Sequence, residues 1–204
     1  MGRYSLIGVQ MFILYKNHID NKYNVLFIKR SQDVAAKPGF YQFIPSGGFE
    51  IFENDDAIVD LEVRPRVLRN NFSLQKALFR EFVEEVFGKQ EFVHNFNGVP
   101  VDSIMGNQYV LEILDMLGKK EAFFEFLGST IDLVGLRHEF SFILRIDNIN
   151  FSKHTFEPNH ESANVDNCKL EEIEFSINRD KLNQGSAGLL YLAKKNHLFI
   201  GVTS

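Results

Sequence analysis

The segment Leu74–Phe87 limits the possible folds more than any other part of the chain, because it predicts one amphipathic helix with both ends marked. Ser73 stands at the N-cap position and Gly88 just after the last turn, where these residue types are favoured. At about 100° per residue one broad arc of this helix is apolar, and it holds Leu78, Phe79, Phe82, Val83, Val86 and Phe87. An arc of this width has to be buried, so the helix is expected to lie on a hydrophobic core.

Runs rich in β-branched and aromatic residues predict a sheet. The predicted strands are Ser5–Tyr15, Lys22–Lys29, Tyr41–Ile44, Glu91–Phe96, Arg137–Asp147 and, more weakly, Ala163–Lys169. A short polar segment separates the first two, which therefore predict a hairpin. Further helices are predicted at Asn107–Leu117, Glu121–Leu127 and Leu182–Lys195. No internal repeat or low-complexity linker divides the sequence, so residues 1–204 are expected to form one domain.

Composition and charge narrow the classes of function. The chain has 204 residues, 45% of them hydrophobic, and can bury a core of its own. Its net charge of -5, without a block of Lys and Arg, argues against a nucleic-acid-binding surface. The single cysteine, Cys168, excludes an internal disulfide and a thiolate metal cluster, and it fits a reducing compartment. Leu6–Tyr15 has no signal-peptide pattern and no apolar run reaches about 18 residues, so we expect a cytoplasmic protein without a membrane span.

Three glutamates share the other side of the predicted helix. Glu81, Glu84 and Glu85 fall within about 100° of one another, and Arg80 precedes Glu84 by four residues. One interpretation is a solvated charged face. Against it, carboxylates three and four residues apart repel each other by a few tenths of a kcal/mol, and anions in the last turn are disfavoured by about 0.3–1 kcal/mol. Carboxylates gathered in an unfavourable place instead indicate a hard cation, for which Mg²⁺ is the first candidate.

Two segments carry a resemblance to a known family. Pro45–Glu50 is a glycine turn after a predicted strand, where backbone can approach a ligand closely. The run Arg80–Glu85, followed by Gly88, resembles the second half of the Nudix box. That pattern is G-x5-E-x7-R-E-U-x-E-E-x-G-U, with U apolar, and the glycine turn resembles its opening.

The chain departs from the Nudix pattern at two places. Val86 and Phe87 stand before the glycine where the pattern has one residue. About twenty inserted residues separate the glycine turn from the helix, and Phe72 occupies the position of the pattern's first glutamate. Glu50 or Glu53 can supply that carboxylate from the loop, and the alternative is that it is absent.

The resemblance implies an α/β fold, the Nudix-type α/β/α sandwich with a mixed β-sheet and helical insertions. In this chain insertions are expected at about 51–71 and 101–130. It also implies Mg²⁺-dependent, or Mn²⁺-dependent, hydrolysis of a diphosphate bond. The helix glutamates then hold the metal, Arg80 orients them, and a later acidic residue, Glu139 or Glu161, completes the site or orients water. The residues assigned to catalysis are Arg80, Glu81, Glu84, Glu85 and Glu139. The expected metal ligands are Glu81, Glu84 and Glu85, and the expected cofactor-binding residues are Gly47, Gly48 and Glu50.

Several of these residues have an alternative interpretation of equal or greater weight. Glu139 is equally well an exposed strand position, and His138 is a packed or surface histidine rather than a ligand. Cys168 is expected to be a buried small apolar residue. The arginines of the insertion can pair with a diphosphate or, more simply, with acidic residues of the same insertion, and they are Arg64, Arg66 and Arg69.

The expected substrate is a small nucleoside diphosphate linked to another moiety, such as ADP-ribose or a dinucleotide. Aromatic walls suit stacking of a base, and the negative net charge argues against a long polyanion. Asn107–Leu127 predicts an apolar helical hairpin that packs on the sheet, lines the substrate site or forms a homodimer contact. The alternative function is a degenerate Nudix domain that binds a nucleotide as a sensor without cleaving it; a protein-interaction module is a third possibility.

Overall fold

The computed structural model describes residues 7–32, 37–49, 73–89, 102–133, 136–158 and 162–202. Several sequence predictions concern residues outside these ranges. They are the strand Glu91–Phe96, the insertion at about 51–71 with its arginines, and the acidic candidates Glu50, Glu53 and Glu161.

The described strands form one mixed sheet. They are β1 (Ile7–Lys16), β2 (Tyr23–Arg30), β3 (Tyr41–Phe43), β4 (Ser46–Gly48), β5 (Ala122–Asp132), β6 (Arg137–Ile146) and β7 (Ser162–Lys169). The order is β3-β2-β1-β6-β5, with β4 paired to β1 and β7 paired to β2. Strands β1 and β6 run parallel and every other pair runs antiparallel, which confirms the predicted hairpin of the first two strands.

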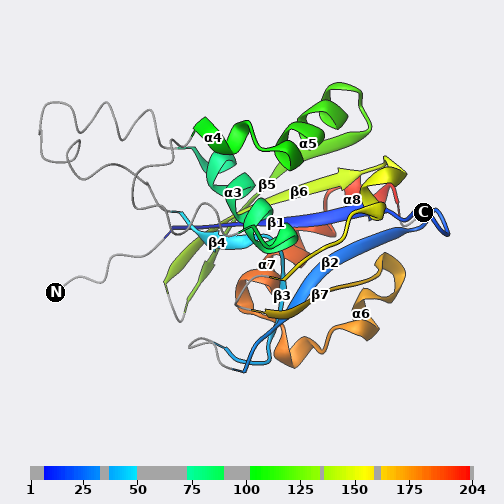
Figure 1. The fold of residues 1–204 in the computed structure, drawn as a ribbon. Helices are drawn as coiled ribbons and strands as arrows, with labels where there is room; N and C mark the ends of the chain where they lie inside the picture. Colours follow the sequence, from blue (N-terminus) through cyan, green and yellow to red (C-terminus); the bar gives the residue numbers. More distant parts are fainter. Residues whose placement is uncertain are drawn as a thin grey trace, which may run out of the picture.

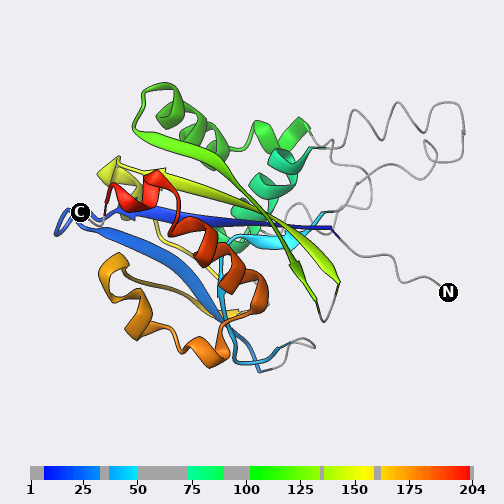
Figure 2. The ribbon, with the colours of Figure 1, turned by 180° about the vertical axis from the view of Figure 1, so that it is seen from behind.

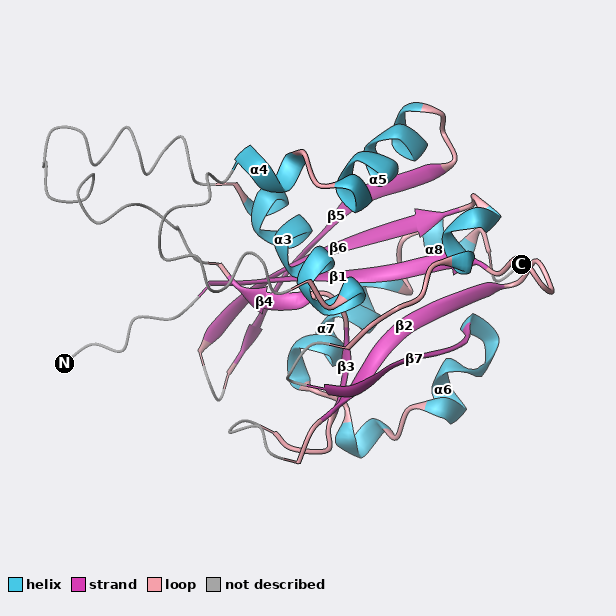
Figure 3. Cartoon of the chain, in the orientation of Figure 1, coloured by secondary structure: helices cyan, strands magenta, loops and turns pink. Residues whose placement is uncertain are grey.

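Helices cover both faces of this sheet (Figures 1 and 2). One face carries α3 (Leu74–Phe87), α4 (Asp102–Met105) and α5 (Gln108–Gly118), and the other carries α7 (Gln184–Ala193) and α8 (His197–Ile200). Figure 3 shows the remaining short helix, α6 (Ile173–Ser176), beside β7. Three 3-10 turns complete the described elements: η2 (Ile149–Lys153), η3 (Leu170–Glu172) and η4 (Arg179–Lys181). The arrangement is the predicted α/β/α sandwich.

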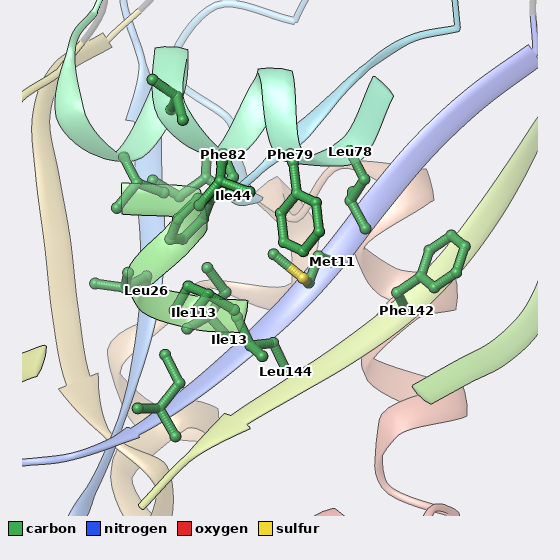
Figure 4. Close-up of a cluster of buried hydrophobic side chains, with 14 of the residues drawn as sticks. Met11, Ile13, Leu26, Ile44, Leu78, Phe79, Phe82, Ile113, Phe142 and Leu144 are labelled. Atoms are coloured by element: carbon green, nitrogen blue, oxygen red, sulfur yellow. The ribbon is translucent and has the colours of Figure 1, made fainter. Parts of the chain in front are cut away.

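Helix α3 has the ends that its sequence predicts. The Ser73 side chain accepts the backbone N–H of Lys76, and Gly88 adopts the left-handed conformation with φ of 62°. Its apolar arc packs on β1 and β6 together with α5 (Figure 4). The core residues labelled there are Met11, Ile13, Leu26, Ile44, Leu78, Phe79, Phe82, Ile113, Phe142 and Leu144. Full burial of one such side chain stabilises the fold by about 1.5–3 kcal/mol, so this core fixes α3 against the sheet.

Alternate residues of the two central strands belong to different cores. Met11 and Ile13 of β1 lie in the core under α3, whereas Phe12 and Leu14 lie in the core under α7. Because side chains alternate between the faces of a strand, Gly8 is on the α7 side of β1. In β6, Ile143 belongs to the core under α7. Glu139 is four residues earlier in the same strand and therefore lies on the same side of the sheet.

The predicted helix Glu121–Leu127 is wrong, because these residues belong to strand β5. Phe124 pairs with Leu144 and Phe126 with Phe142 in an antiparallel register with β6. Aromatic residues favour strands when a partner strand lies beside them, and this partner is distant in sequence. The apolar hairpin Asn107–Leu127 therefore does not exist, residues 122–130 are part of the sheet rather than an insertion, and a homodimer stays a prediction without that support.

The other two predicted helices are present with small changes. Helix α5 begins after its N-cap Asn107 and buries Val110, Ile113 and Met116. The predicted helix Leu182–Lys195 is α7, which begins later, after the N-cap Asn183, and the short helix α8 follows it. Within the described residues, no helix is long and apolar enough to cross a membrane.

Candidate active site

The glycine turn of β4 lies directly against the predicted catalytic helix. A Cβ placed on Gly47 would be 2.0 Å from Cδ of Glu81, so a larger residue would require the Glu81 carboxyl group or the turn to move. The Arg80 guanidinium donates to the Gly48 carbonyl oxygen at 3.2 Å and to Glu81 Oε1 at 2.6 Å. The two segments that resemble the Nudix box, far apart in the sequence, are therefore in contact.

Two of the three helix glutamates are buried beneath this turn. Glu81 is 9% exposed and Glu85 4% exposed, whereas Glu84 is half-buried. Glu85 Oε2 accepts the backbone N–H of Ser46 at 2.6 Å. A buried carboxylate is costly unless it is hydrogen-bonded or paired, and a solvated helix face does not explain these positions. The interpretation of a merely solvated face is wrong for Glu81 and Glu85.

The donor chemistry of α3 fits a hard divalent cation. Its three carboxylates are oxygen ligands of the kind that Mg²⁺ prefers, and Mg²⁺ commonly keeps several waters beside one or two carboxylates. In the described ranges, however, no three His, Cys, Asp or Glu side chains are gathered closely enough to hold an ion. A bound ion would therefore have to draw the side chains of Glu81, Glu84 and Glu85 together.

Glu139 lies apart from the helix glutamates. It is 7% exposed, not an exposed strand position, and it faces α7 on the opposite side of the sheet from α3. Burial raises the pKa of its carboxyl group, and the charge of Arg137 offsets part of that rise. Among the described residues, Glu139 Oε2 has no hydrogen-bond partner. The structure thus does not bring Glu139 together with Glu81, Glu84 and Glu85.

Arg137 is a residue of this region that the sequence patterns did not single out. Its Nη2 donates to the Gly47 carbonyl oxygen at 3.0 Å. Its Nε lies 2.7 Å from Glu139 Oε1, although the N–H is not aimed at that oxygen, so the contact is an ion pair rather than an aligned hydrogen bond. The available signal was the spacing of Arg137 and Glu139, which puts opposite charges on the same face of a predicted strand.

The remaining candidates have structural surroundings of their own. His138 stacks on Phe140 with ring centres 5.5 Å apart, as expected of a packed or surface histidine. Another histidine, His154, was not among the candidates; it follows η2, and its Nε2 lies 2.9 Å from Glu112 Oε2. Cys168 is buried, which confirms the prediction for it, and burial raises the pKa of its thiol.

The fold resembles solved structures, although the sequence has no close match. No protein-family model matches the chain, and no curated protein matches it either. The Nudix domain of Shewanella oneidensis NrtR, in complex with ADP-ribose, is 13% identical, with a TM-score of 0.53 over 95% of this chain and 89% of that one. A MutT/Nudix family protein from Listeria innocua gives 14% identity and a TM-score of 0.52, covering 98% of this chain and 96% of that one. The MutT protein of Methanosarcina mazei is 12% identical, with a TM-score of 0.51 over 97% of this chain and 99% of that one. The chain has the Nudix fold.

Proposed function

We propose that the chain is a Nudix-type hydrolase that cleaves a diphosphate bond with the help of Mg²⁺ or Mn²⁺. The observation that carries this proposal is the burial of Glu81 and Glu85 beneath a turn whose Gly47 leaves room for the Glu81 carboxyl group. Burial of carboxylates beside a tight backbone turn lowers the stability of the fold, so stability does not explain why they are there. Unfavourably buried ionisable groups of this kind concentrate at functional sites.

The proposed metal ligands are Glu81, Glu84 and Glu85. A divalent cation at these carboxylates would neutralise the diphosphate and polarise the phosphorus that is attacked. Arg80 holds one carboxylate oxygen of Glu81 and the Gly48 carbonyl, and the Ser46 N–H holds one oxygen of Glu85. These contacts hold one oxygen of Glu81 and one of Glu85 near the turn before substrate binds, so part of the site is already arranged, and a bound ion would then draw the three carboxylates together. Glu84 is the most exposed of the three, so it is our candidate to accept a proton from the attacking water.

The proposed substrate is a small nucleoside diphosphate linked to another group. The predicted helical hairpin cannot form its wall, but the sheet offers an aromatic strip on the same face as Glu81. His138 and Phe140 of β6 stack on each other, and the half-exposed Phe126 of β5 lies beside Phe140, with ring centres 6.2 Å apart. Val9 of β1 pairs with both Phe140 and Gly47, so the strip begins two strands from the glycine turn. Such rings can stack on a base.

Two further observations support this substrate class. The NrtR Nudix domain, which shares the fold, was crystallised with ADP-ribose. The net charge of -5 disfavours a long polyanion. We place the reaction in the cytoplasm, since the one cysteine, Cys168, is a buried free thiol that suits a reducing compartment.

The alternative function is binding of a nucleotide as a sensor without cleavage. It is favoured by Phe72, which stands where the Nudix pattern has its first glutamate. It is also favoured by the described carboxylates, which are not gathered around one point. The buried positions of Glu81 and Glu85 argue for the hydrolase, since binding of a base needs neither.

Product analysis separates the two functions. The purified chain is incubated with ADP-ribose, a dinucleoside polyphosphate and a nucleoside triphosphate, with Mg²⁺ or with a chelator, and the products are resolved by chromatography. The hydrolase predicts a nucleoside monophosphate from the diphosphate-linked compounds, only when metal is present. Nucleotide binding without turnover supports the sensor, and pyrophosphate from the triphosphate alone overturns the proposed substrate class.

A further inference from the structure

The Arg137 guanidinium connects two strands that are not paired with each other. Arg137 and Glu139 belong to β6, whereas Gly47 belongs to β4, and both strands flank β1. One nitrogen, Nη2, donates to the Gly47 carbonyl oxygen at 3.0 Å, and Nε lies 2.7 Å from Glu139 Oε1. Arg137 therefore reaches across β1 from the α7 side of the sheet to the turn that packs on Glu81.

The crossing is possible because β1 has glycine at the point of passage. A Cβ on Gly8 would lie 1.9 Å from Glu139 Oε2 and 2.8 Å from Arg137 Nε. In the strand register Gly8 is opposite Gly48 on one side and opposite Glu139 on the other. Two glycines thus make room for two carboxyl groups, Gly8 for Glu139 and Gly47 for Glu81, on opposite faces of the sheet.

The ion pair is suited to holding the guanidinium in one place. The Glu139 side chain is 9% exposed and the Arg137 side chain 37% exposed. A buried carboxylate that loses its cationic partner is strongly destabilised, so Glu139 keeps Arg137 close. Arginine presents several donors in a planar fork and can serve two acceptors at fixed angles, which a lysine ammonium on a flexible stem does less well.

We propose that Arg137 is a positioning residue that holds the β4 turn in register over Glu81 and Glu85, and that Glu139 acts through Arg137 rather than beside the helix glutamates. The catalytic part of this assignment rests on the proposed hydrolase function. The structural part concerns the turn alone, and it is testable in the protein without metal or substrate.

Hydrogen exchange at the backbone amides of Ser46, Gly47 and Gly48 tests the structural part. In R137Q the turn loses one hydrogen bond from a charged donor, so its amides should exchange about tenfold faster than in the wild type. The control is R145Q, because Arg145, near the other end of β6, forms an ion pair of 3.1 Å with Asp147, the residue that follows the strand. R145Q should leave exchange in the turn unchanged. Equal exchange in R137Q, R145Q and the wild type would overturn the proposal.

Kinetics of the same variants test the catalytic part. R137Q should lower kcat about tenfold or more with little change in KM for the nucleotide, since misplaced catalytic groups mainly raise the barrier. R137K should recover part of kcat, because lysine can still pair with Glu139, and R145Q should behave as wild type. A rise in KM without faster exchange in the turn would mean that Arg137 contacts the substrate, which contradicts a positioning role. A wild type without any turnover refutes the hydrolase, while the exchange result still decides the role of Arg137.

Discussion

The carboxyl group of Glu81 occupies the space that a side chain on Gly47 would need, with Cδ 2.0 Å from the position of the absent Cβ. Arg80 forms an ion pair with Oε1 of the same carboxyl group, at 2.6 Å. The glycine turn and the glutamate helix are thereby fitted to each other, and a change in either should alter the site before it alters the fold.

Gly47→Ala should therefore remove activity with a smaller effect on stability. The new methyl group has to displace the Glu81 carboxyl group or the turn, and a misplacement of about 1 Å can cost about 100-fold in rate. The variant is compared with wild type by turnover and thermal unfolding. The control is Gly118→Ala at the end of α5, where a Cβ meets nothing within 4 Å. If Gly47→Ala turns over like the control, the close contact has no functional role.

Phe126→Ala tests the aromatic strip as the base-binding surface. Loss of one stacking ring should raise KM for a nucleoside substrate about tenfold and leave kcat nearly unchanged. Phe175→Ala serves as the control, because Phe175 is an exposed phenylalanine, 91% accessible, on α6 beside β7. An unchanged KM in Phe126→Ala would place the base elsewhere.

Phe82→Ala tests the packing that holds α3 on the sheet. The ring is fully buried in the core of Figure 4, and its removal should lower the free energy of unfolding by about 3–5 kcal/mol. Leu111→Ala on α5 alters a side chain that is 51% exposed and should cost less than about 1 kcal/mol. Urea denaturation measures both, and a loss below about 1 kcal/mol in Phe82→Ala would contradict the packing described.

The pH dependence of stability reports on Glu139. Burial raises the pKa of this carboxyl group above 4.5, so the folded protein binds that proton more tightly than the unfolded chain does. The free energy of unfolding should therefore fall as the pH rises from 4.5 to the raised pKa, and remain lower above it. Glu139→Gln removes this contribution. Thermal unfolding across that interval should show the wild type losing stability relative to Glu139→Gln, and parallel curves would be inconsistent with the burial of the charged group.

Local signals made α3 predictable from the sequence. Ser73, Gly88 and the apolar arc between them act within one helix, and the structure reproduces both boundaries. The sequence of β5 predicts a helix wrongly, because the apolar residues Phe123 to Leu127 alone do not distinguish a helix from a strand. What makes this segment a strand is its pairing with β6.

The site shows the same division between local and distant effects. The sequence placed the helix glutamates and the glycine turn in one site, because a known pattern links them, and the structure brings both segments into contact. It did not reveal the contact between Arg137 and Gly47, which are 90 residues apart. That contact depends on β1 passing between β4 and β6 with glycine at residue 8, and no spacing within either segment indicates it.

Glu85→Gln is the most direct test of a metal-dependent hydrolase. The amide oxygen of glutamine can still accept the Ser46 N–H, so the fold should be kept. The lost charge should relieve repulsion along α3 and remove a carboxylate from the metal site. Mg²⁺-dependent release of a nucleoside monophosphate is measured beside Glu112→Gln, whose carboxylate pairs with His154. Glu85→Gln should be inactive at every Mg²⁺ concentration and should unfold at the wild-type temperature or above, whereas Glu112→Gln should be fully active. Near-normal turnover by a folded Glu85→Gln would contradict a metal-dependent hydrolase.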